Sequence, residues 1–205
     1  MSKFTPQLWD LAEEFFHDED LRRMHAVVET HPLSFEQLFE FDEMLGGASM
    51  SQLNHNGTGH YHPSDSDVFR SLQYCAMYFD RKYDMNEVEW HARLIVQMSG
   101  LHIESLLNRV GDFFGFTLGH VLHDKRIRKR IGIEAWGQIA RFRKIYSAAK
   151  HEIGRHVFSV EDAVLVYFVS RRLSESFYPL AKLRTRFPPA IRLASEGRFT
   201  CIEGG

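Results

Sequence analysis

Apolar residues recur at helical spacing along most of the chain, and no run alternates polar and apolar residues for long enough to predict a sheet. The first segment begins at Thr5-Pro6, an N-cap followed by proline, and continues to His31, where Pro32 ends it. A second helix is expected from Ser34, which forms a capping-box pattern with Gln37, to the Gly46-Gly47 pair.

The segment after the second predicted helix has a different composition and lacks a helical period. Residues 46–67 are rich in Gly, Ser, Asn and His without a sustained period, which predicts a long loop before a third helix at 68–83. Asn86 with Glu89 begins a helix that we expect to run to about Val110. Glycines then punctuate a turn-rich segment between residues 111 and 119.

Two further helices are expected in the C-terminal half. One runs from about Ile131 to Ile153, and the next begins at Ser159, which forms a second capping-box pattern with Asp162. This last helix is apolar on more than one face, so we expect it to be the most buried element and to end near Pro179. The tail after it is weakly patterned and is expected to be a strand or a docked arm.

These patterns predict an all-α helical bundle in a single domain of 205 residues. We divide it into acidic N-terminal helices (1–45), a long loop (46–67), a bundle core (68–185) and a tail (186–205). The two cysteines form no disulfide framework, and no apolar run approaches the roughly 20 residues that span a bilayer. The expectation is therefore a soluble, cytoplasmic protein with no membrane association.

Charge is distributed unevenly, although the net charge is only -2. Residues 1–65 carry three basic and twelve acidic side chains, whereas residues 125–155 carry ten basic and two acidic ones. Five cations fall within the six residues from Lys125 to Arg130. Such asymmetry indicates a basic surface for an anionic partner, an acidic segment that covers that surface within the same molecule, or simply two solvated helix faces.

The basic helix also carries candidate chemistry. Lys144, Ser147, His151 and Arg155 fall on one helical stripe, because seven residues turn through almost two full turns. Arg143, Tyr146 and Lys150 form a parallel stripe beside it. A histidine flanked by cations protonates less readily, so His151 is a candidate general base next to a phosphate-binding group.

The run Tyr146-Ser-Ala-Ala-Lys-His-Glu152, with the apolar helix 160–180 after it and the helix 91–110 containing Glu104-Ser-Leu-Leu before it, resembles the HEPN superfamily of helical bundles. The resemblance covers roughly residues 87–185. Many HEPN proteins are metal-independent ribonucleases of toxin-antitoxin or phage-defence systems, and they commonly pair with two histidine-bearing helices facing one cleft. The resemblance therefore implies an RNA- or nucleotide-interacting protein, a metal-independent endoribonuclease activity and a homodimer.

The resemblance also implies residue roles. His151 would transfer a proton at the 2'-hydroxyl, and Lys144 or Arg143 would contact the scissile phosphate, with Tyr146 available for stacking. The family signature is arginine, four to six residues, then histidine; here Lys144 occupies that spacing and Arg143 lies one residue beyond it. RNA-binding residues would extend the phosphate track. They are Lys125, Arg126, Arg128, Lys129, Arg130, Lys150 and Arg155.

Two other interpretations remain open. The chain is alternatively a non-catalytic protein-protein interaction module that uses its acidic N-terminal helices or an apolar helix face. In the loop, His55, His60 and His62 have spacing that could bind zinc or nickel, with Asp65 or Asp67 completing the shell, but the loop offers no fixed framework. We predict no metal or other cofactor, and the sequence contains no P-loop, Gly-x-Ser-x-Gly or His-Glu-x-x-His motif.

Overall fold

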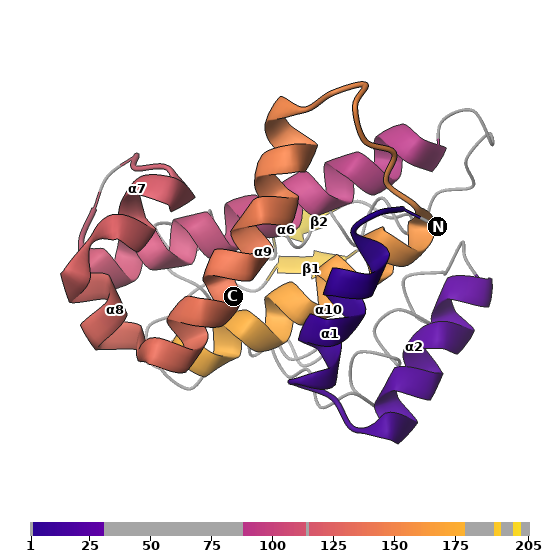
Figure 1. Ribbon diagram of the computed structural model, residues 1–205, viewed down its shortest axis with the longest axis horizontal. Coiled ribbons are helices and arrows are strands. Elements are labelled where there is room, and N and C mark those ends of the chain that lie inside the picture. The colour runs from indigo at the N-terminus through magenta and orange to yellow at the C-terminus, as the bar shows by residue number, and fades with distance from the viewer. Residues whose placement is uncertain (1, 31–87, 114, 179–190, 194–198, 202–205) are drawn as a thin grey trace.

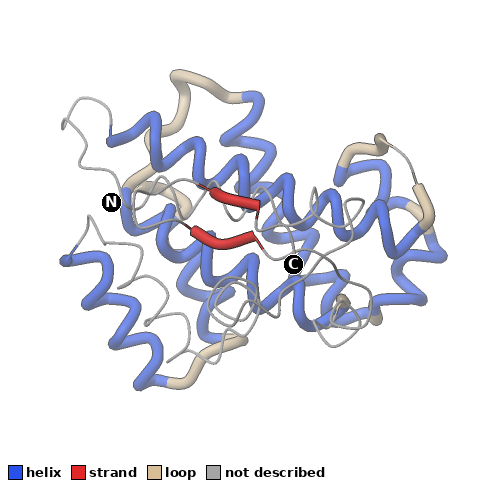
Figure 2. The backbone as a smooth tube through the Cα atoms, turned by 180° about the vertical axis from the view of Figure 1, so that it is seen from behind, coloured by secondary structure: helices blue, strands red, loops and turns tan. Residues whose placement is uncertain are grey.

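The computed structural model describes residues 2–30, 88–113, 115–178, 191–193 and 199–201 (Figure 1). Helices make up most of this part of the chain, which confirms the predicted helical class. They are α1 (Thr5–Glu13), α2 (Asp18–Thr30), α6 (Val88–Gly111), α7 (Leu118–His123), α8 (Lys125–Ile131), α9 (Ile133–His151) and α10 (Val160–Phe177). Two short strands follow, β1 (Ile191–Leu193) and β2 (Phe199–Cys201), paired antiparallel with Arg192 opposite Thr200 (Figure 2). The helices expected at 34–47 and 68–83 and the loop 46–67 lie outside the described residues.

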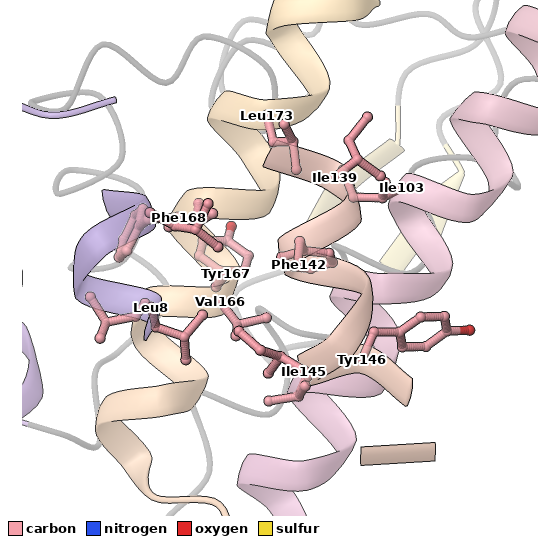
Figure 3. Packing of buried hydrophobic residues seen from close by; sticks show 14 of the residues in the cluster. Leu8, Ile103, Ile139, Phe142, Ile145, Tyr146, Val166, Tyr167, Phe168 and Leu173 are labelled. Carbon is pink, nitrogen blue, oxygen red and sulfur yellow. The ribbon is translucent and has the colours of Figure 1, made fainter. Parts of the chain in front are cut away.

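Helix α10 is the buried centre of the bundle, as its composition predicts. Every residue from Asp162 to Arg171 is buried, and α10 packs along α6 with α1, α2 and α9 around it. The predicted capping box is present: Asp162 N donates to Ser159 Oγ and Ser159 N donates to the Asp162 carboxylate. Figure 3 shows Leu8 of α1, Ile145 of α9 and Val166 of α10 in one apolar cluster.

Thr5 has a different role from the N-cap that the sequence predicts. The N-cap of α1 is Phe4, without a side-chain hydrogen bond, and Thr5 is the first helical residue. Its hydroxyl is buried and donates to Asp162 Oδ1 at 2.8 Å. The polar group that would have capped its own helix instead joins α1 to the start of α10.

The first predicted helical segment is divided into α1 and α2. The chain turns at the end of α1, where the amides of Phe15 and Phe16 both donate to the carbonyl of Ala12. Helix α2 then begins with three acidic residues, Asp18, Glu19 and Asp20, which interact favourably with the positive end of a helix dipole. The apolar spacing continues across the break, and for that reason it predicts one helix where there are two.

Buried Arg93 on α6 holds the C-terminal end of α9 in place. Its guanidinium donates to the carbonyl oxygens of Ala149 and His156, and Gln97 also donates to the Ala149 carbonyl, at 2.6 Å. Carbonyls in the last turn of a helix lack partners within that helix, and a cation there is favourable. This arrangement fixes the position of the helix end that carries His151.

The turn-rich segment predicted at 111–119 leads into two short helices that the sequence analysis does not predict, α7 and α8. Each begins with a capping side chain: Thr117 accepts from the amide of His120, and Asp124 accepts from the amide of Arg126. Gly132, with φ of 88°, then separates α8 from α9. None of the described helices is long and apolar enough to cross a membrane.

Candidate nucleic-acid interface

Helix α8 presents an exposed set of cations, here called the α8 basic surface. Its residues are Lys125, Arg126, Arg128, Lys129 and Arg130. Ile127 is fully buried and anchors the helix, and the five cationic side chains are exposed. Helix α8 lies at the end of the molecule opposite α2 (Figure 1).

Carboxylates neutralise only part of the α8 basic surface. Asp124 binds Arg126 with a closest approach of 2.6 Å, and this hydrogen bonding holds the pKa of Asp124 below its ordinary value. Arg130 donates to the Val110 carbonyl and lies 3.5 Å from Asp112. Within the part of the chain that the structure describes, Lys125, Arg128 and Lys129 form no ion pair.

A row of aromatic rings lies beside these cations. The guanidinium carbon of Arg126 is 5.2 Å from the ring centre of Phe113, whose ring is 5.3 Å from that of Phe116. The ring of His120 is 6.3 Å further on. Phe116 is 48% exposed, so a large apolar side chain faces solvent next to the α8 basic surface.

Two side chains of α6 hold the segment that carries Phe116. The carboxamide of Asn108 accepts from Phe116 N at 3.2 Å and donates to Phe116 O at 2.8 Å. The carboxylate of Glu104 accepts from Leu118 N at 2.6 Å, which satisfies an amide in the first turn of α7. The exposed ring therefore projects from a backbone that is hydrogen-bonded to the core helix on both sides.

The predicted stripe of Arg143, Tyr146 and Lys150 on α9 faces α6 and α7. The guanidinium of Arg143 covers Gly119, where an added Cβ would lie 3.2 Å from Nη2. The Tyr146 ring packs against Gly100, and an added Cβ there would lie 2.1 Å from Cδ2. Lys150 Nζ is 5.4 Å from the centre of the same ring.

Tyr146 is only 3% exposed, so its ring has no free face for a base, in contrast to the stacking role expected from the sequence. Burial, together with the negative charge of Glu104, raises the pKa of Tyr146. The phenol therefore stays protonated at neutral pH. In this arrangement Tyr146 contributes to the packing of α9 on α6.

The predicted stripe containing Lys144 and His151 lies on another side of α9. Lys144 is exposed and borders a groove of about 230 Å³ between α1 and α9. His151 is exposed at the last residue of α9, and Arg155 is exposed in the connection that follows. Two helical turns separate Lys144 from His151, or roughly 10 Å along the axis.

The structure thus divides the predicted RNA-binding residues between the two ends of α9. Ile133, next to α8, and His151 are 18 residues apart, which corresponds to about 27 Å of helix. Lys150, His151 and Arg155 form one group, and the α8 basic surface forms another. A single bound phosphate cannot contact both.

Phe116, His120 and Asn108 are not among the site residues predicted from the sequence. The available signal was an aromatic residue in a glycine-rich segment, nine positions before a run of cations. No group of three His, Cys, Asp or Glu side chains within the described ranges could hold a metal ion. The histidine-rich loop with His55, His60 and His62 lies outside those ranges.

No protein-family model, curated protein or solved structure matches the chain.

Proposed function

We propose that this protein binds RNA through the α8 basic surface. The observation that carries the proposal is a seven-residue helix with five exposed cations, three of them outside any ion pair in the described structure, beside exposed Phe116. Cations that follow a phosphate backbone, combined with aromatic rings, are typical of proteins that bind single-stranded nucleic acid.

The charge distribution of the fold supports this choice of surface. On α9, Arg141 is paired with Glu14, and Lys144 shares the groove with Asp10 of α1. The acidic N-terminal region therefore covers part of the basic run from inside the molecule. Within the described residues, the cations of α8 form no ion pair with α1 or α2, and we assign them to an external anion.

Charge reversal tests the proposal directly. We expect Lys125→Glu/Lys129→Glu to weaken binding to a labelled RNA pool by at least about tenfold in fluorescence anisotropy, since several phosphate contacts are lost. The matched control is Arg22→Glu, which reverses an exposed cation on α2 at the other end of the molecule. RNA binding that is equal in all three proteins would overturn the proposal and favour the protein-interaction alternative.

Metal-independent RNA cleavage is the second candidate function. The observation that favours it is that His151 and Lys144 are both exposed on the same stripe of α9, with the helix end held by Arg93. The resemblance to HEPN proteins supports a proton-transfer role for His151. Arg143 is directed towards Gly119 on α7, which leaves Lys144 as the cation on the His151 stripe.

We also propose that two copies of the chain pair as a homodimer and that the protein is cytoplasmic. Ile153 and Val157 follow His151 and are 60% and 64% exposed, so a second copy of the chain would bury apolar surface there. Light scattering of the purified chain tests the expected homodimer. A monomeric mass at all concentrations would contradict it.

A further inference from the structure

Phe116 presents an exposed aromatic ring on a segment outside the helices whose backbone is nevertheless hydrogen-bonded. Its ring is 48% exposed, yet its backbone amide and carbonyl are both hydrogen-bonded to Asn108 of α6. Exposing such a ring forgoes the free energy of burying it, which for a large apolar side chain is substantial. A ring that is exposed on a fixed backbone is suited to receive a planar apolar group from a partner.

The surroundings of the ring indicate the chemistry of that group. Phe113 and His120 flank Phe116 with interplanar angles of 67°, so each contacts the Phe116 ring edge-on and the three rings lie in a row. Arg126 extends it at the α8 end, where its guanidinium lies over Phe113. A planar ring system linked to phosphates matches this combination of aromatic surface and adjoining cations.

We infer that Phe116 stacks on an unpaired base of RNA whose phosphates follow the α8 basic surface. The inference rests on the proposed function and narrows it to a ligand class, single-stranded rather than duplex RNA. Bases in a duplex are stacked on each other, and their faces are not accessible to a protein side chain. Asn108 is a positioning residue, because its carboxamide is bonded to both the amide and the carbonyl of Phe116.

The test compares Phe116→Ala and Phe116→Trp with the native chain on three probes of one sequence: unstructured RNA, the corresponding RNA duplex and single-stranded DNA. We expect Phe116→Ala to weaken binding of the unstructured RNA by about tenfold and to leave duplex binding unchanged, since stacking of one base is worth roughly that factor. Phe116→Trp should restore binding, because a larger aromatic ring still stacks.

A fluorescent base analogue provides an independent readout. With 2-aminopurine in the unstructured RNA, we expect quenching on binding to the native chain and to Phe116→Trp, and none with Phe116→Ala. Equal weakening of DNA and RNA binding would show that the site reads unpaired bases without contacting the 2'-hydroxyl. That result still supports stacking on an unpaired base.

The outcomes also separate this inference from the proposed function. If Phe116→Ala binds single strands and duplex as the native chain does, stacking is wrong. If it weakens both forms equally, selection of unpaired bases is wrong. Failure of Lys125→Glu/Lys129→Glu to weaken any RNA complex would instead overturn the proposed function.

Discussion

Arg141 on α9 is bonded to Glu14, the residue after the last turn of α1, with 2.5 Å between Nη1 and Oε1. Gln138 donates to the same carboxylate at 3.0 Å. This contact joins the acidic N-terminal region to the basic helix within one molecule. Arg141 of the basic helix α9 is thus paired with the acidic N-terminal region, whereas the cations of α8 form no ion pair with α1 or α2 in the described structure.

The Glu14 contact predicts a small pH dependence of stability. The hydrogen bond from Arg141 outweighs the opposing effect of burial and holds the pKa of Glu14 below 4.5, its ordinary value. The contribution of this contact to the free energy of unfolding is therefore fully present above pH 4.5. It is lost as the pH falls through the lower pKa that Glu14 has in the folded state. Because both side chains are exposed, the effect should not exceed about 1 kcal/mol.

Urea unfolding of the native chain and Glu14→Gln between pH 7 and pH 3 checks this expectation. The difference in the free energy of unfolding between the two proteins should shrink towards the acid end. A difference that grows on acidification would contradict the assigned direction of the pKa shift.

Gly100 allows the close approach of α6 and Tyr146. We expect Gly100→Ala to lower the free energy of unfolding by about 1–3 kcal/mol, because the new Cβ would overlap the ring. The matched control is Gly137→Ala on α9, where an added Cβ meets nothing within 4 Å and helix propensity rises. Thermal unfolding of the two variants should move in opposite directions, and parallel shifts would refute the packing described.

Thr5 joins α1 to α10 through its hydroxyl. We expect Thr5→Val to cost about 1–3 kcal/mol, since it leaves the buried carboxylate of Asp162 without that donor. Thr5→Ser retains the hydroxyl and should remain closer to the native chain. Chemical denaturation followed by circular dichroism would count against this contact if the serine variant were the less stable of the two.

Cleavage is tested in EDTA with His151→Ala. If the second candidate function is correct, the native chain cleaves labelled RNA without metal and the variant does so at least about a hundredfold more slowly, as expected for loss of a general base. His123→Ala, which removes an exposed histidine on α7, is the control. Equal cleavage by His151→Ala, or none by the native chain, would remove this candidate and leave RNA binding alone.

Local signals in the sequence identify the long helices better than their connections. Ser159 and Asp162 are three residues apart and determine the start of α10, so the pattern alone is sufficient there. Helices α7 and α8 were missed because Gly111, Gly115 and Gly119 indicate turns, while the short helices begin at caps between and after them.

The candidate site depends more on tertiary contacts. Tyr146 was expected to be available for stacking on RNA, but Gly100, 46 positions earlier, lets α6 cover it. Phe116 becomes a candidate only once Asn108 is seen to hold its backbone. Neither relationship has a period or spacing that reveals it in the sequence.

The most direct test of RNA binding through the α8 basic surface is the salt dependence of binding to unstructured RNA. We expect a steep linear decrease of the logarithm of the binding constant with the logarithm of salt concentration. For Lys125→Gln/Lys129→Gln the slope should be shallower by about 1.4, since each single-strand phosphate contact contributes about 0.7. An unchanged slope in this variant, or no measurable binding by the native chain at low salt, would contradict the account.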